Sequence, residues 1–333
     1  MSQYGDGQAP ISVVHNAYTP KEAIEISSRA GAYKARMRID KIIMSAFMAG
    51  ALLSFAGAGF VTINAAPWFQ TNAPGVIKML GALEFGGGLV VIVMTGADLA
   101  TGSFMYTTLS TLHRRTSILL MLRHWALTFL GNLAGALFIV GIIIGHGGVL
   151  SADLYKNEAL TIATAKVVTP QWHQVFLRAI GANWLVCLAC FLACCAREFF
   201  SKVVAIWWPV FVFVLLGLDH VIANMFYIPM AIFLGHPKIT VGYYIWKSMI
   251  PAALGNIIGG GLFVAVVYWY LYLVGDTNPV TIDGDNFDLR STPLVRRQTN
   301  DDSVHQHHHH HHHHSESPSP PSAGHAKTAE AMV

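Results

Sequence analysis

Residues 210–225 read Val-Phe-Val-Phe-Val-Leu-Leu-Gly-Leu-Asp-His-Val-Ile-Ala-Asn-Met, so that Asp219 and His220 interrupt a long apolar run. An acid and an imidazole are costly inside a bilayer unless they face a pore, a water-filled pocket or a partner. Ionisable groups in such a place usually mark the path of a substrate or a proton. The segment therefore predicts a membrane transporter with His220 at its centre.

The composition of the whole chain also favours a membrane protein. Of its 333 residues, 53% are hydrophobic and only 12% are charged, about half the charged share of a typical soluble protein. A transmembrane helix needs roughly 20 mainly apolar residues, and six stretches meet this need, the second and fifth of them interrupted in the middle. The predicted spans are 42–64, 75–97 with a continuation to 112, 118–145, 174–196, 203–218 with a continuation to 235, and 245–274. No nucleic-acid partner is expected.

The distribution of basic residues predicts the orientation. Ten of them cluster before the first span and after the second and fourth: Lys21, Arg29, Lys34, Arg36, Arg38, Lys41, Arg114, Arg115, Arg197 and Lys202. The opposite side has a thinner set: Lys78, Lys156, Lys166 and Lys238. The positive-inside rule then places both termini in the cytoplasm. We expect residues 1–40 to be a cytoplasmic segment with a short amphipathic surface helix over 20–31, and residues 41–275 to form the transport domain. An uptake role would place the protein in the plasma membrane.

The last part of the chain differs in kind from the rest. Residues 276–333 are polar and rich in Ser and Pro, a composition that predicts a disordered cytoplasmic tail. The run from His307 to His314 is either a natural low-complexity tract or an expression tag. In both cases we exclude the tail from the transport mechanism.

All four cysteines lie in the predicted fourth span, at Cys187, Cys190, Cys194 and Cys195. Their spacing could indicate metal or redox chemistry, but no histidine or acid within the span accompanies them. The simpler interpretation is that they are small apolar residues at helix contacts. No metal, cofactor or disulfide is predicted.

An internal repeat relates the two halves of the predicted transport domain. Residues 131–138 read GNLAGALF and residues 255–263 read GNIIGGGLF, and each follows an interrupted span at a similar distance. Two halves of three spans must enter the bilayer in opposite directions, which is typical of inverted-repeat transporters and channels. We expect the small residues of the repeat to pack helices together. The sequence therefore predicts an all-α membrane protein with six transmembrane helices, a 3+3 inverted repeat and broken second and fifth helices.

The two interruptions carry the candidate site. The first, residues 95–103, reads TGADLATGS and suits a short loop that plugs a pore, with the Thr101 hydroxyl available to a substrate and Asp98 bracing the loop. The second contains Asp219, His220 and, further on, Asn224. Pseudo-symmetry brings both breaks to the centre of the membrane, so Thr101 and His220 are expected to be neighbours.

Five motifs, taken in order, resemble the formate/nitrite transporter family over residues 30–275. They are TGADLATG from Thr95, GNLAGA from Gly131, ANWLVCLA from Ala182, DHVIANM from Asp219 and IPAALGN from Ile250. The His- and Ser-rich tail and the Trp-rich flanks are similar to the fungal nitrite transporters of that family. The resemblance implies an aquaporin-like fold, one pore per subunit and a homopentamer.

The resemblance also implies roles for particular residues. They are His220 as the central pore histidine, Thr101 as the loop threonine that faces it, Asn183 and Asn224 as pore asparagines, Phe85 and Phe213 as the outer constriction, Leu89 and Leu99 as the inner constriction, and Lys34 and Lys166 as vestibule lysines that attract anions. Two positions depart from the family pattern. Ala100 replaces a Phe, which leaves the inner slit wider or filled by another side chain, and Asp219 replaces a Glu, which puts a proton relay through it in doubt.

Physical chemistry limits how such a pore can work. A bare anion would lose its hydration between two apolar rings at high cost, and pairing with a proton removes most of that cost. We therefore expect proton-coupled transport of nitrite, with a formate or lactate channel or transporter as the alternative; the proton comes from His220 or from bulk water. A neutral-solute channel is less well supported, because the paired Asn-Pro-Ala turns of water channels are absent. An enzyme is not expected.

Three polar residues inside the spans are left with simpler interpretations. Arg123 and His124 are expected to reach the cytoplasmic interface from the start of the third span. Glu84, in the second span, either lines the outer vestibule or faces a subunit contact.

Overall fold

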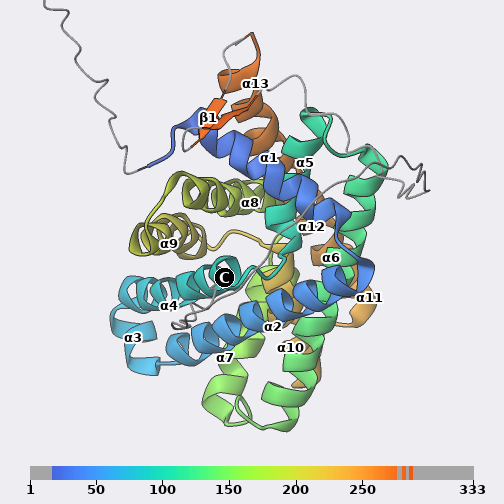
Figure 1. Ribbon diagram of the computed structural model, residues 1–333. Coiled ribbons are helices and arrows are strands. Elements are labelled where there is room, and N and C mark those ends of the chain that lie inside the picture. The colour runs from blue at the N-terminus through green and yellow to red at the C-terminus, as the bar shows by residue number, and fades with distance from the viewer. Residues whose placement is uncertain (1–16, 276–279, 283–284, 288–333) are drawn as a thin grey trace, which may run out of the picture. The chain divides into compact units, whose positions relative to one another are not determined.

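The computed structural model describes residues 17–275, 280–282 and 285–287 (Figure 1). The elements, in chain order, are α1 (Pro20–Arg36), α2 (Ile39–Asn64), α3 (Pro67–Asn72), α4 (Pro74–Thr95), α5 (Ala100–Leu112), α6 (Ile118–Phe138), η1 (Ile139–His146), α7 (Asp153–Ala163), η2 (Thr164–Val168), α8 (Trp172–Cys195), α9 (Phe199–Leu215), α10 (Val221–Phe233), α11 (Val241–Tyr244), η3 (Ile245–Met249), α12 (Ile250–Ile257), η4 (Ile258–Val266), α13 (Val267–Leu273), β1 (Val280–Ile282) and β2 (Asp285–Phe287), where η marks π-helical turns.

Within the described residues, five helices are long and apolar enough to cross a membrane. They are Ile39–Asn64, Pro74–Thr95, Ile118–His146, Trp172–Cys195 and Val241–Leu273, where the third and fifth include π-helical turns. The region of the predicted fifth span, 203–218 with its continuation to 235, contains two shorter apolar helices, α9 and α10. Gly217 follows α9 with a φ of 71°, and Gly96 follows α4 with a φ of 73°. A left-handed residue cannot continue an α-helix, so the chain turns at both places.

The long helices pack in two similar groups. α2 contacts α4 and α6, α8 contacts α9 and α12, and α4 lies beside α9 (Figure 1). The glycines of the repeat permit these contacts, as expected: a Cβ on Gly135 would lie 2.0 Å from the Phe47 carbonyl oxygen of α2. A Cβ on Gly259 would lie 2.3 Å from the Ile180 carbonyl oxygen of α8. The helix backbones therefore touch directly, which side chains larger than hydrogen would prevent.

Helix α1 differs from the short surface helix expected over 20–31. It begins with a capping box between Thr19 and Glu22, continues to Arg36 and packs against α5 and α8 (Figure 1). Ala23 and Ile24 are fully buried in this contact. The helix is longer and more internal than predicted because its partners come from distant parts of the chain.

Two further regions depart from the sequence-based expectation. Residues 153–168, for which no element was predicted, form α7 and η2 and place Lys166 beside the second break. Within the predicted disordered tail, β1 and β2 pair as an antiparallel hairpin, with Val280 opposite Phe287 and the Val280 side chain buried. Pairing and burial together order these few residues. The rest of the tail, including the histidine run, lies outside the described residues.

Candidate functional site

Two cavities enter the protein and meet at a narrow apolar constriction. We call them the wide cavity, of about 360 Å³, and the narrow cavity, of about 150 Å³. The space between them is only about 10 Å³. It shares Phe85, Phe213 and His220 with the wide cavity, and Leu89 and Leu99 with the narrow one. The four predicted constriction residues thus surround one point, two facing each cavity.

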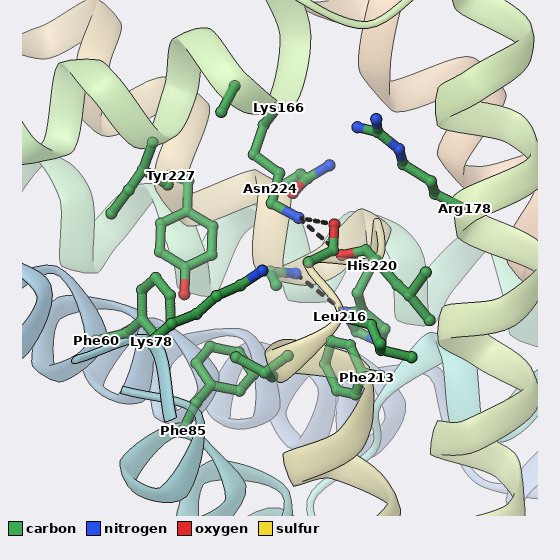
Figure 2. Close-up of a pocket in the computed structure, with 16 residues that line it drawn as sticks. Phe60, Lys78, Phe85, Lys166, Arg178, Phe213, Leu216, His220, Asn224 and Tyr227 are labelled. Atoms are coloured by element: carbon green, nitrogen blue, oxygen red, sulfur yellow. Dashed lines mark hydrogen bonds between the residues drawn. The ribbon is translucent and has the colours of Figure 1, made fainter. Parts of the chain in front are cut away.

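Aromatic packing closes the wide side of the constriction. The rings of Phe85 and Phe213 have centroids 6.0 Å apart and meet edge to face at 89°, a favourable geometry for an aromatic pair. Phe85 also stacks on Tyr227, at 6.4 Å. The three residues line the wide cavity, with Tyr227 to the left of Phe213 in Figure 2. A solute passing here must therefore shed most of its water.

The two breaks meet at the constriction through Thr101 and His220. The Thr101 hydroxyl oxygen lies 2.8 Å from His220 Nε2, and both residues are buried. His220 precedes α10, and its Nδ1 accepts a hydrogen bond from the Ala223 backbone N–H at 3.1 Å. Because Nδ1 is an acceptor, the neutral ring carries its proton on Nε2 and donates it to Thr101 Oγ1. The hydroxyl hydrogen of Thr101 is then free to donate to a third group.

Two asparagines of the repeat hold the breaks in equivalent ways. Asn132 Oδ1 accepts the Ala100 N–H at 2.9 Å, and its amide donates to the carbonyls of Ala46 and Asp98. Asn256 Oδ1 accepts the Val221 N–H at 2.8 Å, and its amide donates to the carbonyls of Ala179 and Asp219. Each asparagine thereby satisfies the first N–H of a half-helix and anchors the loop before it.

The two vestibule lysines pair with the two acids of the breaks. Lys34 Nζ lies 3.1 Å from Asp98 Oδ1, and Lys166 Nζ lies 3.2 Å from Asp219 Oδ1. Lys166 also donates to the carbonyls of Gly217, at 3.3 Å, and Leu218, at 2.7 Å (Figure 2). An ammonium group has three hydrogens to donate, so all those of Lys166 are engaged within the protein.

The two asparagines expected in the pore, Asn183 and Asn224, use their amide hydrogens within the protein. Asn183 Nδ2 donates to the carbonyls of Thr101, at 3.1 Å, and Asn256, at 2.6 Å. Asn224 lines the wide cavity, but its Nδ2 donates to Asp219 Oδ1 and Ser248 Oγ. Both amide hydrogens of each side chain are therefore used, and the remaining oxygens would repel an anion.

Ala100 also has a role other than the one expected. It is fully buried, and it is absent from the described residues that line the cavities and the constriction. What matters at this position is its backbone N–H, which Asn132 binds. Leu89 and Leu99 line the constriction together with Leu53.

The interfacial position expected for His124 is wrong, whereas that of Arg123 stays a prediction. Arg123 donates to the Ala35 carbonyl of α1 at 2.9 Å, and His124 is fully buried with Nε2 3.0 Å from Asp98 Oδ2. His124 therefore belongs to the polar support of the first break, which sequence reasoning missed. Its position eight residues before Asn132 could have indicated this, because Ser248 stands eight residues before Asn256 and contacts the second break through Asn224.

Glu84 lies outside the pore, whereas two of the cysteines line it. Glu84 faces α2, where a Cβ on Gly59 would lie 2.2 Å from Glu84 Oε1, and it lines neither cavity. Cys190 and Cys194 line the narrow cavity beside Tyr106. Among the residues that the structure describes, no group of three His, Cys, Asp or Glu side chains is arranged to hold a metal ion.

Membrane-length apolar helices, together with two cavities that meet at a constriction, define a channel or transporter for small solutes. The sequence profile of the formate/nitrite transporter family matches residues 21–270. A probable formate transporter of Methanothermobacter thermautotrophicus is 35% identical over 268 residues, which cover 77% of this chain and 97% of that protein. The formate channel FocA of Escherichia coli K12 is 32% identical over 276 residues, covering 76% and 94%. The chain belongs to the formate/nitrite transporter family.

A solved structure described as a pentameric formate channel with formate bound has the same fold. It matches with a TM-score of 0.63 and 29% sequence identity, covering 71% of this chain and 98% of that one. Members of the family are channels and transporters of small anions, and this chain is one of them.

Proposed function

We propose that this protein moves formate and nitrite, each together with a proton, through the path from the wide cavity to the narrow one. The observation that carries the proposal is the apolar constriction of about 10 Å³ with the Thr101–His220 pair at its edge. Stripping water from a charged anion there without a partner is very costly. The neutral acid avoids most of this cost, so a proton travels with the anion.

Thr101 is the group that receives the anion in this proposal. Its hydroxyl hydrogen is the one left free when His220 Nε2–H donates to Thr101 Oγ1. The N-terminal ends of α5 and α10 begin at this point, and the positive ends of their helix dipoles favour a negative charge. The anion of a monoprotic acid can accept a hydrogen bond from the Thr101 hydroxyl before it takes up a proton.

The proton comes from bulk water through the cavities rather than from His220. Nδ1 already caps α10 through the Ala223 N–H, so a second proton there would break that bond. Loss of the Nε2 proton would leave an imidazolate, which is far too basic to form in this site. His220 therefore positions Thr101 and keeps its hydroxyl directed toward the substrate.

The arrangement of the chain supports several finer proposals. The matching contacts of Asn132 and Asn256, and of Lys34 and Lys166, support a 3+3 inverted repeat with two broken helices. The basic residues flanking the spans support cytoplasmic termini, so the wide cavity faces outward. A pentameric relative supports a homopentamer, and an uptake role places it in the plasma membrane. Lactate is a third candidate, although its extra carbons fit the constriction less well.

The test is uptake of formate and nitrite by proteoliposomes that contain the full-length protein, with and without an inward proton gradient. Protein-free vesicles correct for leakage of the neutral acids. We expect the gradient to raise uptake of both anions. Uptake of either anion at the same rate with and without the proton gradient would contradict proton coupling.

A variant separates the two sources of the proton. His220→Asn keeps an acceptor for the Ala223 N–H, but the shorter amide does not reach the position of Nε2, so Thr101 loses its donor. We expect slower uptake that still responds to the gradient, because the proton comes from water. Uptake that loses its response to the gradient would identify His220 as the donor instead.

A further inference from the structure

The contacts that hold the two breaks do not account for all the charged side chains that line the wide cavity. Among the described residues that line it, the charged ones are Lys78 from α4, Lys166 from η2 and Arg178 from α8, and all three are basic. Lys166 is fully engaged by Asp219 and two carbonyls. Lys78 and Arg178 make no ion pair or hydrogen bond with the part of the chain that the structure describes.

The narrow cavity gives a direct comparison. Its charged lining residues are Lys34 and Asp98, which neutralise each other at 3.1 Å. The wide cavity therefore carries two uncompensated positive charges, and the narrow cavity carries none among its described lining residues. Figure 2 shows hydrogen bonds leaving the Lys166 ammonium but none leaving Lys78 or Arg178.

Position and chemistry make these two side chains suitable for an anion. Lys78 Nζ lies near Gly217, at the start of the second break, 4.0 Å from where a Cβ on that glycine would be. Arg178 offers a planar guanidinium that matches the two oxygens of a carboxylate or of nitrite. A cavity of about 360 Å³ has room for such an anion with part of its water.

We propose that Lys78 and Arg178 form an anion-capture site in the wide cavity, selective for small carboxylates and similar planar oxyanions, and that Lys166 instead holds the second break. The site concentrates the anion above the Phe85–Phe213 constriction before it loses its remaining water. Attraction by partly hydrated cations is weak and sensitive to salt. It raises occupancy without changing the barrier at Thr101.

The kinetic test rests on the proposed transport function. Initial rates of formate uptake are measured in proteoliposomes for Lys78→Gln, Arg178→Gln and the double variant, with Lys238→Gln as a matched control. Lys238 is exposed and is not among the residues that line the wide cavity. We expect each single variant to raise KM by roughly threefold to tenfold, with kcat within twofold and a weaker dependence on ionic strength. Lys78→Arg should behave like the wild type.

Lys166→Gln tests whether Lys166 binds the anion or stabilises the second break. It should lower the unfolding temperature, because Asp219 loses its cationic partner. A KM for Lys78→Gln and Arg178→Gln within twofold of the wild type would overturn the proposal. So would a larger KM increase for Lys166→Gln than for either of them.

A binding measurement separates this proposal from the transport function. If wild-type vesicles move neither anion, the transport proposal fails, and broadening of the carbon-13 formate signal by the full-length protein in detergent decides the capture site. Broadening that the double variant abolishes, while Lys238→Gln retains it, would support the site. Equal broadening by wild type and double variant, or none by the wild type, would overturn it.

Discussion

Replacing Asn256 with Leu removes one buried side chain that joins three backbone groups. Val221 N–H loses its acceptor, and the carbonyls of Ala179 and Asp219 lose a donor. Three hydrogen bonds within a membrane, at about 0.6 kcal/mol each, set a lower limit of about 2 kcal/mol. An orphaned buried N–H adds about 1–3 kcal/mol. We therefore expect the free energy of unfolding to fall by about 3–5 kcal/mol.

The measurement is reversible unfolding in mixed detergent micelles, followed by loss of helical circular dichroism. Asn132→Leu should cost a similar amount, because Asn132 makes the same three kinds of contact at the first break. Asn72→Leu is the control, since Asn72 is exposed and bonds only within its own short helix among the described residues. A loss below about 1 kcal/mol for Asn256→Leu would refute the reasoning. A difference above about 2 kcal/mol between the two asparagines would refute their equivalence.

Three further perturbations test other parts of the structure. Thr101→Val should lower formate uptake by about tenfold to a hundredfold, because one charge-assisted hydrogen bond is lost, whereas Thr101→Ser should retain most of the uptake. Equal uptake rates for Thr101→Val and the wild type would show that the hydroxyl takes no part in transport. Arg115→Met leaves the buried Glu25 carboxylate without the Arg115 guanidinium and should cost about 3–5 kcal/mol in unfolding, while Arg115→Met with Glu25→Gln should recover much of it. Burial, and then the Arg115 charge, lowers the pKa of His113 to about 4. The unfolded chain therefore takes up a proton near pH 6.5 before the folded one does, so stability should fall between pH 6.5 and 4 by up to about 3 kcal/mol; His113→Gln should flatten this slope, and an unchanged slope would assign it to other groups.

Sequence patterns predicted most helix positions closely, because lipid demands long apolar runs and closed backbone hydrogen bonding. The break after α4 was predictable since Gly96 and Asp98 cannot continue a lipid-facing helix. The repeat alone made Thr101 and His220 neighbours, and the structure places them 2.8 Å apart.

Pairing between distant side chains was not predictable from the sequence. The resemblance implied that Asn183 faces the substrate, but its two amide hydrogens reach carbonyls 82 and 73 residues away. His124 resembled an interfacial residue because only the folded chain brings Asp98 beside it. Local patterns report burial and helix breaks, whereas donor and acceptor assignments depend on which helices touch.

The ion pair between Glu25 and Arg115 has a consequence for how the protein is made. The Glu25 carboxylate leaves the ribosome 90 residues ahead of Arg115, whose guanidinium binds both of its oxygens in the folded protein. Arg29, on the same helix, pairs with one of these oxygens at 2.7 Å but stays partly exposed. Burying the carboxylate without Arg115 is therefore unfavourable, so we expect α1 to stay in water while α2, α4 and α5 insert. The packing of α1 then becomes a late step of biogenesis. It covers the first half of the protein only after that half has been synthesised and inserted.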